Sequence, residues 1–485
     1  MKMVKSLLLG SAAGLVAVAG AQAADLPVKA KPVEYVKVCS LYGAGFWYVP
    51  GTDTCLKIGS FVRVQTAWNT SSSDVPIGSG ADAGMGRQDR TDTANFGFRV
   101  RSGVSVDLRT QTEYGTLRSY MDVGAQWSAA SAGSTGDNNS AVADVLWVDR
   151  GFIQFAGFTV GRIRSYFDIN SFAPYSIGNS RISGDTGALG IYGLAYTAQF
   201  GNGITATLSL EDNGQASGGR GHFDLNAGAA IIALGATTFD NKGQQAPDVV
   251  GALRIDQAWG YAQVSAALHD ASGGYYSPLL TTSGHPADKF GVAVTGGFTL
   301  NDILGFKGDT FAMQACWSEG AAGYCTRATG VWQMYNAGNN VGVGYVSDGV
   351  FATGTAIELT TVWGINGAVQ HLWTPKWRTS LYGGYIEVDY NANARTEICG
   401  SPAVNFTVTN CQPNFSWWQL GSRTQWNPHP DLDIGLDVVW THLNTAFKGP
   451  GVQLANNGAR PAGPLVIDDQ DVVSVMFRIQ RNFLP

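Results

Sequence analysis

The sequence has little charge and, beyond its first 25 residues, no long hydrophobic run. Only 14% of its 485 residues are Asp, Glu, Lys or Arg, whereas soluble proteins usually carry about 25%. No internal apolar run reaches the roughly 18 residues that a membrane-spanning helix needs. The composition therefore fits neither an ordinary soluble protein nor a helical membrane protein.

An excess of positive charge is missing as well. The chain has 31 Lys and Arg residues against 37 Asp and Glu, a net charge of −6. Domains that bind nucleic acid carry a basic patch and a high isoelectric point. We therefore expect no nucleic-acid partner.

Motifs for catalysis or metal binding are also missing. No histidine forms a recognisable arrangement with a nucleophile and a carboxylate. The six histidines are His222, His269, His285, His371, His429 and His442. Cys-x-x-Cys and His-x-x-x-His spacings do not occur. We expect no cofactor, no metal and no enzymatic activity. An enzyme built on a β-barrel stays an alternative, because residues distant in sequence can meet in space.

The N-terminus has the pattern of a secretory signal peptide. Lys2 and Lys5 precede an apolar stretch over residues 7–19, and Ala21-Gln22-Ala23 offers the small residues of a cleavage site. We expect residues 1–23 to be removed and residues 24–485 to form the mature protein. A retained membrane anchor is the alternative, which the short, alanine-rich stretch disfavours.

The six cysteines fall into three local pairs. These are Cys39 with Cys55, Cys316 with Cys325, and Cys399 with Cys411. An even number of cysteines in an exported chain indicates disulfides. We predict three intrachain disulfides, two of which would brace long loops on the outside of the cell.

What the sequence does have is strand periodicity. In NFGFRVRSGVSVDLRT, residues 95–110, six of the eight even positions are apolar and the odd positions include Arg99, Arg101, Asp107 and Arg109. A period of two predicts a strand with two different faces. Sixteen such segments occur. Eight run one way, from near Leu56, Leu117, Phe158, Ile204, Tyr261, Thr310, Trp377 and Leu432; eight return, from near Ala94, Trp147, Gly190, Val249, Lys289, Ala356, Phe415 and Asp471.

The links between these segments alternate between short and long. Short links include 112–116 and 201–203, and long links include 69–93, 214–248, 321–355, 391–414 and 445–470. Outer-membrane barrels have short periplasmic turns and long extracellular loops. We therefore predict an all-β fold, a transmembrane antiparallel β-barrel of about 16 strands in the cell outer membrane. A soluble sandwich, as in a secreted adhesin or lectin, is the alternative for any single strand.

In such a barrel, the two faces of each strand meet different solvents. Only a closed barrel satisfies all backbone groups of strands in hydrocarbon, and its outer face must be apolar. We expect Phe96, Phe98, Val100, Val104, Val106 and Leu108, together with Ile58, Val62 and Val64, to face lipid. The charged side chains between them would then face a wet lumen.

Four longer blocks resemble a known family. They are CSLYGAGFWYVPGTDTCLKIGSFVR, NFGFRVRSGVSVDLRTQTEYGTLRSYMDVG, DRGFIQFAGFTVGRIRSYFD and the ending FRIQRNFLP. These blocks are similar to the general porins of alphaproteobacteria, found in rhizobia and their relatives. The resemblance runs over nearly the whole mature chain and is densest in its first third.

The resemblance implies a sixteen-stranded barrel, a homotrimer, and a third long loop that folds into the pore. Here that loop is 169–189, and it carries Ala173-Pro174-Tyr175 where enterobacterial porins have Pro-Glu-Phe-Gly-Gly. The chain also ends on Leu484 and Pro485, whereas barrel proteins commonly end on an aromatic residue. The partners implied are outer-membrane lipid, lipopolysaccharide, and small hydrophilic solutes and ions.

The function expected is that of a porin, a water-filled channel for passive diffusion of small hydrophilic solutes and ions. The constriction would have a basic wall of Arg63, Arg99, Arg101, Arg109 and Lys57, opposed by Asp168, Asp185 and Tyr175 of the infolded loop. Fixed charge in a narrow pore sets ion preference. A substrate-specific channel, for example a sugar-selective one, is the alternative; the inward aromatics Tyr120, Tyr382 and Trp417 do not form an obvious series along the pore.

Overall fold

The structure is a computed structural model of the 485-residue chain. It describes residues 37–69, 96–129, 142–169, 190–212, 224–226, 241–243, 245–277, 280–326, 330–334, 340–400, 411–454 and 463–483. The predicted signal peptide, residues 1–23, lies outside the described residues.

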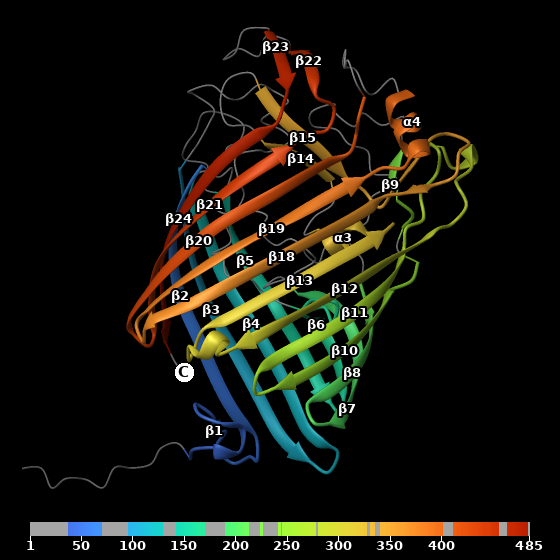
Figure 1. The fold of residues 1–485 in the computed structure, drawn as a ribbon. Coiled ribbons are helices and arrows are strands. Elements are labelled where there is room, and N and C mark those ends of the chain that lie inside the picture. The colour runs from blue at the N-terminus through green and yellow to red at the C-terminus, as the bar shows by residue number, and fades with distance from the viewer. Residues whose placement is uncertain are drawn as a thin grey trace, which may run out of the picture.

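Sixteen antiparallel strands form one closed sheet (Figure 1). They are β2 (Cys55–Trp68), β3 (Phe96–Thr112), β4 (Gly115–Ala129), β5 (Val142–Phe155), β6 (Phe158–Ile163), β7 (Ile191–Gly201), β8 (Ile204–Glu211), β10 (Asp248–Gln257), β11 (Gly260–Asp270), β12 (Phe290–Asn301), β13 (Thr310–Glu319), β18 (Thr361–Thr374), β19 (Trp377–Asp389), β20 (Phe415–His429), β21 (Leu432–Asn444) and β24 (Gln470–Phe483). Each pairs with its predecessor, and β2 pairs with β24 to close the ring. The predicted barrel is confirmed, and the sandwich alternative is wrong because the sheet closes on itself.

The strand positions agree closely with the periodicity. The largest departures are β18, predicted from Ala356 and observed from Thr361, and β5, predicted from Trp147 and observed from Val142. Tight connections such as 113–114, 156–157 and 202–203 lie at one end, which we call the short-turn end. All the extended connections leave the opposite, long-loop end.

The two faces of each strand differ in exposure, as the alternation predicts. On the outer face Phe96 is 46% exposed, Val104 43% and Val62 41%. On the inner face Arg99 is 4% exposed and Asp107 8%. The apolar side chains therefore cover the outside of the barrel, and the charged side chains of β3 point inward.

A small disulfide-bonded cap lies at the short-turn end. The 3-10 helix η2 (Ser40–Tyr42) and strand β1 (Trp47–Tyr48) precede β2, and β1 pairs with its start. The Cys39–Cys55 disulfide closes this unit around the buried ring of Phe46. Figure 1 shows the cap below the first strands.

The other two predicted disulfides are present as well. Cys399–Cys411 ties α4 (Ala392–Gly400) to the residues before β20, and Cys316–Cys325 joins β13 to α3 (Ala322–Cys325). The expectation that the second of these braces a loop on the outside is wrong. Cys316 and Cys325 are both buried on the inner side of the barrel wall.

The long loops build two further sheets at their end of the barrel (Figure 1). One contains β14 (Gly330–Met334), β15 (Asn340–Val346), β22 (Gly449–Leu454) and β23 (Gly463–Ile467). The other contains β9 (Asp224–Asn226), β16 (Gly349–Phe351) and β17 (Glu358–Leu359). The loops at this end are thus joined to one another by backbone hydrogen bonds. Across the described residues, no helix is long and apolar enough to span a membrane.

Candidate functional site: the charged lumen wall

Two of the predicted arginines face each other across neighbouring strands. Arg63 on β2 and Arg101 on β3 are direct register partners, so their side chains lie on the same inner face. Arg63 donates from Nε to Oε1 of Gln480 at 2.7 Å. The Arg101 guanidinium lies 3.5 Å from the Asp149 carboxylate and 4.8 Å from the ring centre of Trp147. Contacts on both sides hold these two cations in place.

Arg99 is next to them and is held by an amide. Its Nε and Nη2 donate to Oε1 of Gln65 at 3.0 and 2.8 Å. Gln65 is the register partner of Arg99 and is itself buried. A neutral acceptor fixes the planar guanidinium without cancelling its charge.

Arg109 and Lys57 lie lower, at the short-turn end. Arg109 stacks on the cap ring of Phe46 at 4.9 Å, and Lys57 donates to the Ala44 carbonyl at 3.3 Å. Arg109 also makes two hydrogen bonds, of 3.1 and 2.8 Å, to Asp107. The structure therefore divides the five predicted cations into an upper group of three and a lower pair against the cap.

The described part of the third long loop turns into the lumen. After β6, the backbone amide of Tyr166 and the hydroxyl of Ser165 donate to Glu211 of β8, at 2.9 and 2.6 Å. Gln263 of β11 donates to the carbonyls of Tyr166 and Asp168. Asp168 is nearly buried. Tyr175 and Asp185 lie outside the described residues.

A cavity of about 490 Å³ lies beside this turn, and four arginines line it. They come from four places: Arg118 on β4, Arg150 on β5, Arg164 after β6, and Arg254 on β10. Other lining residues are Tyr120, Phe152, Gln154, Thr159, Ile163, Ser165, Tyr166, Asp168, Ile169 and Gln263. The cavity is therefore basic, with aromatic rings and one described carboxylate of the third loop.

The sequence interpretation missed Arg150 and Arg254 as lumen residues. The alternation along β10 could have identified Arg254, because Arg254 falls in phase with the inward residues Val250 and Ala252 of that strand. Arg150 has no such signal. A register shift between β4 and β5 next to Asp122 leaves Asp149 without a cross-strand partner and changes the phase of β5, and simple alternation cannot predict a bulge.

Aromatic rings accompany the arginines along this wall. Arg118 lies 5.3 Å from the ring centres of both Tyr120 and Phe152, and Arg254 lies 3.9 Å from that of Tyr261. Arg118 also bonds Asp107 through two nitrogens, each at 3.0 Å. The chemistry available is that of fixed cations and hydrogen-bond donors facing water. Among the described residues, no group of three or more His, Cys, Asp or Glu side chains could hold a metal ion.

A closed barrel with this wall can be compared with known families. The sequence profile of the family described as the porin subfamily matches residues 25–476, nearly the whole chain. The chain belongs to this porin family. The barrel and the family together place the porin in the outer membrane of a bacterium.

Individual relatives agree with this assignment. The porin is 36% identical to porin Omp2b of Brucella canis over 262 residues, and 35% identical to porin Omp2b of Brucella melitensis. These matches cover 53% of this chain and 63% of each relative, so the porin spans less than two thirds of the curated relatives it matches. A solved structure of the outer membrane channel DcaP of Acinetobacter baumannii has the same fold, with a TM-score of 0.57 and 14% identity over 90% of this chain and 99% of that one.

Proposed function

We propose that this porin forms a water-filled channel through which small hydrophilic solutes and ions diffuse passively across the outer membrane. The observation that carries the proposal is the closed barrel with an apolar outside and an arginine-lined inside. Lipid covers the outer face, and water solvates the charges of the lumen. Membership of a porin family implies a channel rather than an enzyme, and transport of this kind changes no covalent bond.

The selectivity proposed is that of a basic eyelet. Arg63, Arg99 and Arg101 form its upper wall, and the arginines around the cavity extend it toward the third loop. Fixed positive charge in a narrow pore favours anions over cations. The proposed counter-charges are Asp168 and Asp185 of the third loop, which also carries Tyr175, and they would produce a field across the pore.

Planar-bilayer recording tests the channel itself. Purified porin should produce discrete conductance steps, and the reversal potential in a salt gradient should report the ion preference. Liposome swelling with sugars of increasing size separates a general pore from a substrate-specific one. A smooth decline with size supports the general porin, and saturable uptake of one sugar supports the sugar-selective alternative.

The assembly we propose is a homotrimer surrounded by outer-membrane lipid and lipopolysaccharide, as the family resemblance implies. The exposed aromatic and aliphatic residues of the outer face provide an apolar surface for contact with lipid and with the other subunits. We also propose that residues 1–23 are removed on export and that the short turns face the periplasm. Native mass spectrometry in detergent measures the subunit number, and N-terminal sequencing of the membrane form measures the cleavage point.

A further inference from the structure

Near the long-loop end, one side of the barrel has several large apolar side chains on its inner face. On β18 to β24, inward residues near the long-loop end are nearly inaccessible. They are Val362, Ile386, Val388, Phe415, Trp417, Leu443 and Val472. Their outward neighbours, such as Trp363 and Val473, are exposed. Whatever covers the inward residues must therefore lie inside the barrel.

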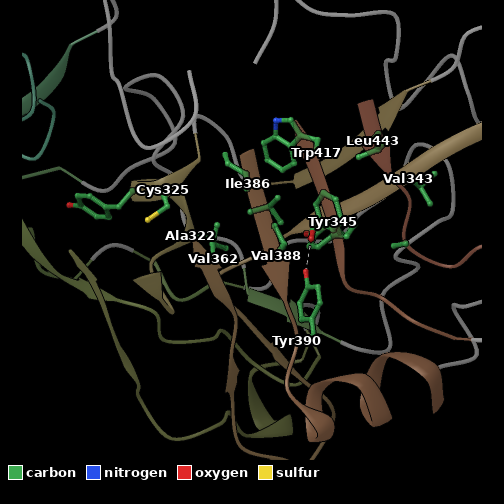
Figure 2. Close-up of a cluster of buried hydrophobic side chains, with 14 of the residues drawn as sticks. Ala322, Cys325, Val343, Tyr345, Val362, Ile386, Val388, Tyr390, Trp417 and Leu443 are labelled. Carbon is green, nitrogen blue, oxygen red and sulfur yellow. Dashed lines mark hydrogen bonds between the residues drawn. The ribbon is translucent and has the colours of Figure 1, made fainter. Parts of the chain in front are cut away.

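The cover is the described part of the sixth long loop, which runs from residue 320 to residue 360 and which we call the inner loop. Its segment 341–351 is buried at every residue. Figure 2 shows Val343 and Tyr345 among Ile386, Val388, Trp417 and Leu443 of the wall. A segment buried on both of its faces must have the barrel wall on one side and other parts of the protein on the other.

Close backbone approach explains the glycines of this segment. A Cβ on Gly344 would lie 2.3 Å from ring atoms of Phe415, and one on Gly342 would lie 2.9 Å from a methyl group of Leu443. Hydrogen bonds fix the same contact. The Tyr390 hydroxyl donates to the Tyr345 carbonyl at 2.6 Å, and the Val343 amide donates to the Thr445 hydroxyl at 2.8 Å.

A buried polar cluster anchors the other end of the inner loop. His269 of β11 lies between two carboxylates, 2.8 Å from Asp248 of β10 and 3.5 Å from Asp348 of the loop. Asp348 also accepts the amide of Ala322 at 2.6 Å, and Tyr324 donates to Asp248 at 2.7 Å. The Cys316–Cys325 disulfide then binds α3 covalently to the wall.

The inner loop also supports the third loop. The Phe167 ring packs edge-on against Tyr324, with centroids 4.8 Å apart. Phe167 is completely buried, one residue before Asp168. The turn that begins the third loop therefore rests on α3 of the inner loop.

We propose that the inner loop is a second, fixed constriction of the pore, on the long-loop side of the basic eyelet. The proposal rests on the proposed channel function and names a further element that determines the solute size. Because the loop occupies the lumen beside β18 to β24, solutes must pass along the rest of the wall, which includes β2 to β5 with their arginines. The inner loop would then direct solutes onto the charged wall as well as limit their size.

Deletion of the inner loop is the direct test. Glu319 and Thr361 are register partners at the ends of β13 and β18, so an Asn-Gly turn can replace residues 320–360 without changing the barrel register. Cys316→Ser in the same variant removes the unpaired thiol. We expect larger single-channel conductance and entry of larger sugars than in the parent.

A point substitution gives the same test without a deletion. Gly344→Val should push β15 off Phe415, and Phe415→Ala added to it should make room and restore the parent conductance. Gly400→Val in the seventh loop is the matched control, because a Cβ there meets no atom within 4 Å. Migration of unheated samples in gels reports barrel assembly for every variant.

The outcomes separate the two proposals. If the parent protein forms no channel, the channel function is wrong. If the parent conducts and the assembled deletion variant has the same conductance and sugar limit, the inner loop is not a constriction. Should the deletion variant not assemble, Gly344→Val decides: a change in conductance that Phe415→Ala reverses supports the second constriction, and unchanged conductance overturns it.

Discussion

At the scale of single residues, the most informative fact is that neighbours on one strand meet different solvents. Val104 is exposed on the outer face, and the next residue, Ser105, points inward opposite Asp122 of β4. Sequence alternation predicts this contrast, because the side-chain period of a strand is two. It cannot predict which charges pair, since partners such as Arg63 and Gln480 are 417 residues apart.

Arginine substitutions at these two positions test the faces. Val104→Arg places a charge against lipid, which costs about 2 to 4 kcal/mol near the bilayer midplane. Ser105→Arg places the same charge in the lumen, where Asp122 can pair with it. We expect only the first variant to assemble poorly, measured by folding yield into vesicles. Equal yields would contradict the assignment of the faces.

The upper arginines should control ion preference. In Arg63→Ala and Arg101→Ala, the reversal potential in a salt gradient should shift toward cations and conductance should rise, because fixed positive charge and side-chain bulk are both lost. Lys307→Ala, at an exposed position in a turn at the short-turn end, is the control. If both arginine variants match the parent porin, these residues do not line the constriction.

At the scale of elements, the strands were predictable and the inner loop was not. Each strand repeats the two-residue alternation of apolar and polar side chains. A long connection has no such periodicity, so its sequence does not show whether it folds into the lumen or away from it. One signal was present: NVGVGYVSDGVF, residues 340–351, has a single charged residue in a loop expected to face water. Cys316 was another signal, because it falls in phase with inward residues of β13, so its bond to Cys325 required the loop to turn inward.

The buried cluster around His269 should anchor the inner loop. His269→Ala leaves Asp248 and Asp348 buried without the imidazole between them, and removing one partner of a buried pair costs about 3 to 5 kcal/mol. His442→Ala is the matched control, because its partner Asp471 is about half exposed and such surface pairs contribute only about 0 to 1 kcal/mol. Urea unfolding in detergent should show a large loss for the first variant only; similar losses would show that the cluster is no anchor.

The cap should depend on its own disulfide. Cross-linking a loop of about 15 residues stabilises by roughly 3 kcal/mol in the chain-entropy model, and Cys39 and Cys55 are 16 residues apart. In Cys39→Ser with Cys55→Ser, we expect protease to cleave within residues 38–54 while the barrel stays assembled. An intact cap after digestion would mean that the contacts of Phe46 with Arg109 and Lys57 hold it without the bond.

At the scale of the whole molecule, the barrel has one seam. Strand β24 bonds to β21 on one side and to β2 on the other, with Ser60 opposite Phe483. The seam followed from the sequence only once sixteen strands and an apolar outer face were assumed, because an open sheet would leave unpaired edges in lipid. The shape of the lumen did not follow, since it depends on which loops enter it.

A chain that ends before β24 tests the seam. Without residues 470–485, strands β2 and β21 both keep free edges, so we expect no heat-resistant barrel and no channel activity. Removing only residues 484–485 is the control, and it should leave both unchanged. Assembly of the shorter chain into conducting pores would show that closure does not need the last strand.

The seam also decides when the protein can fold. The first and last barrel strands are adjacent in space, so no pairing of β2 with β24 can form until the whole chain is available. Contacts between such distant segments make folding slow. Until β2 and β24 have paired, the exposed edges of the unpaired strands can pair with other chains. A porin with this topology therefore needs protection from aggregation for as long as its final 14 strand residues are missing, and the time taken to deliver them sets a lower limit on how quickly new pores can appear.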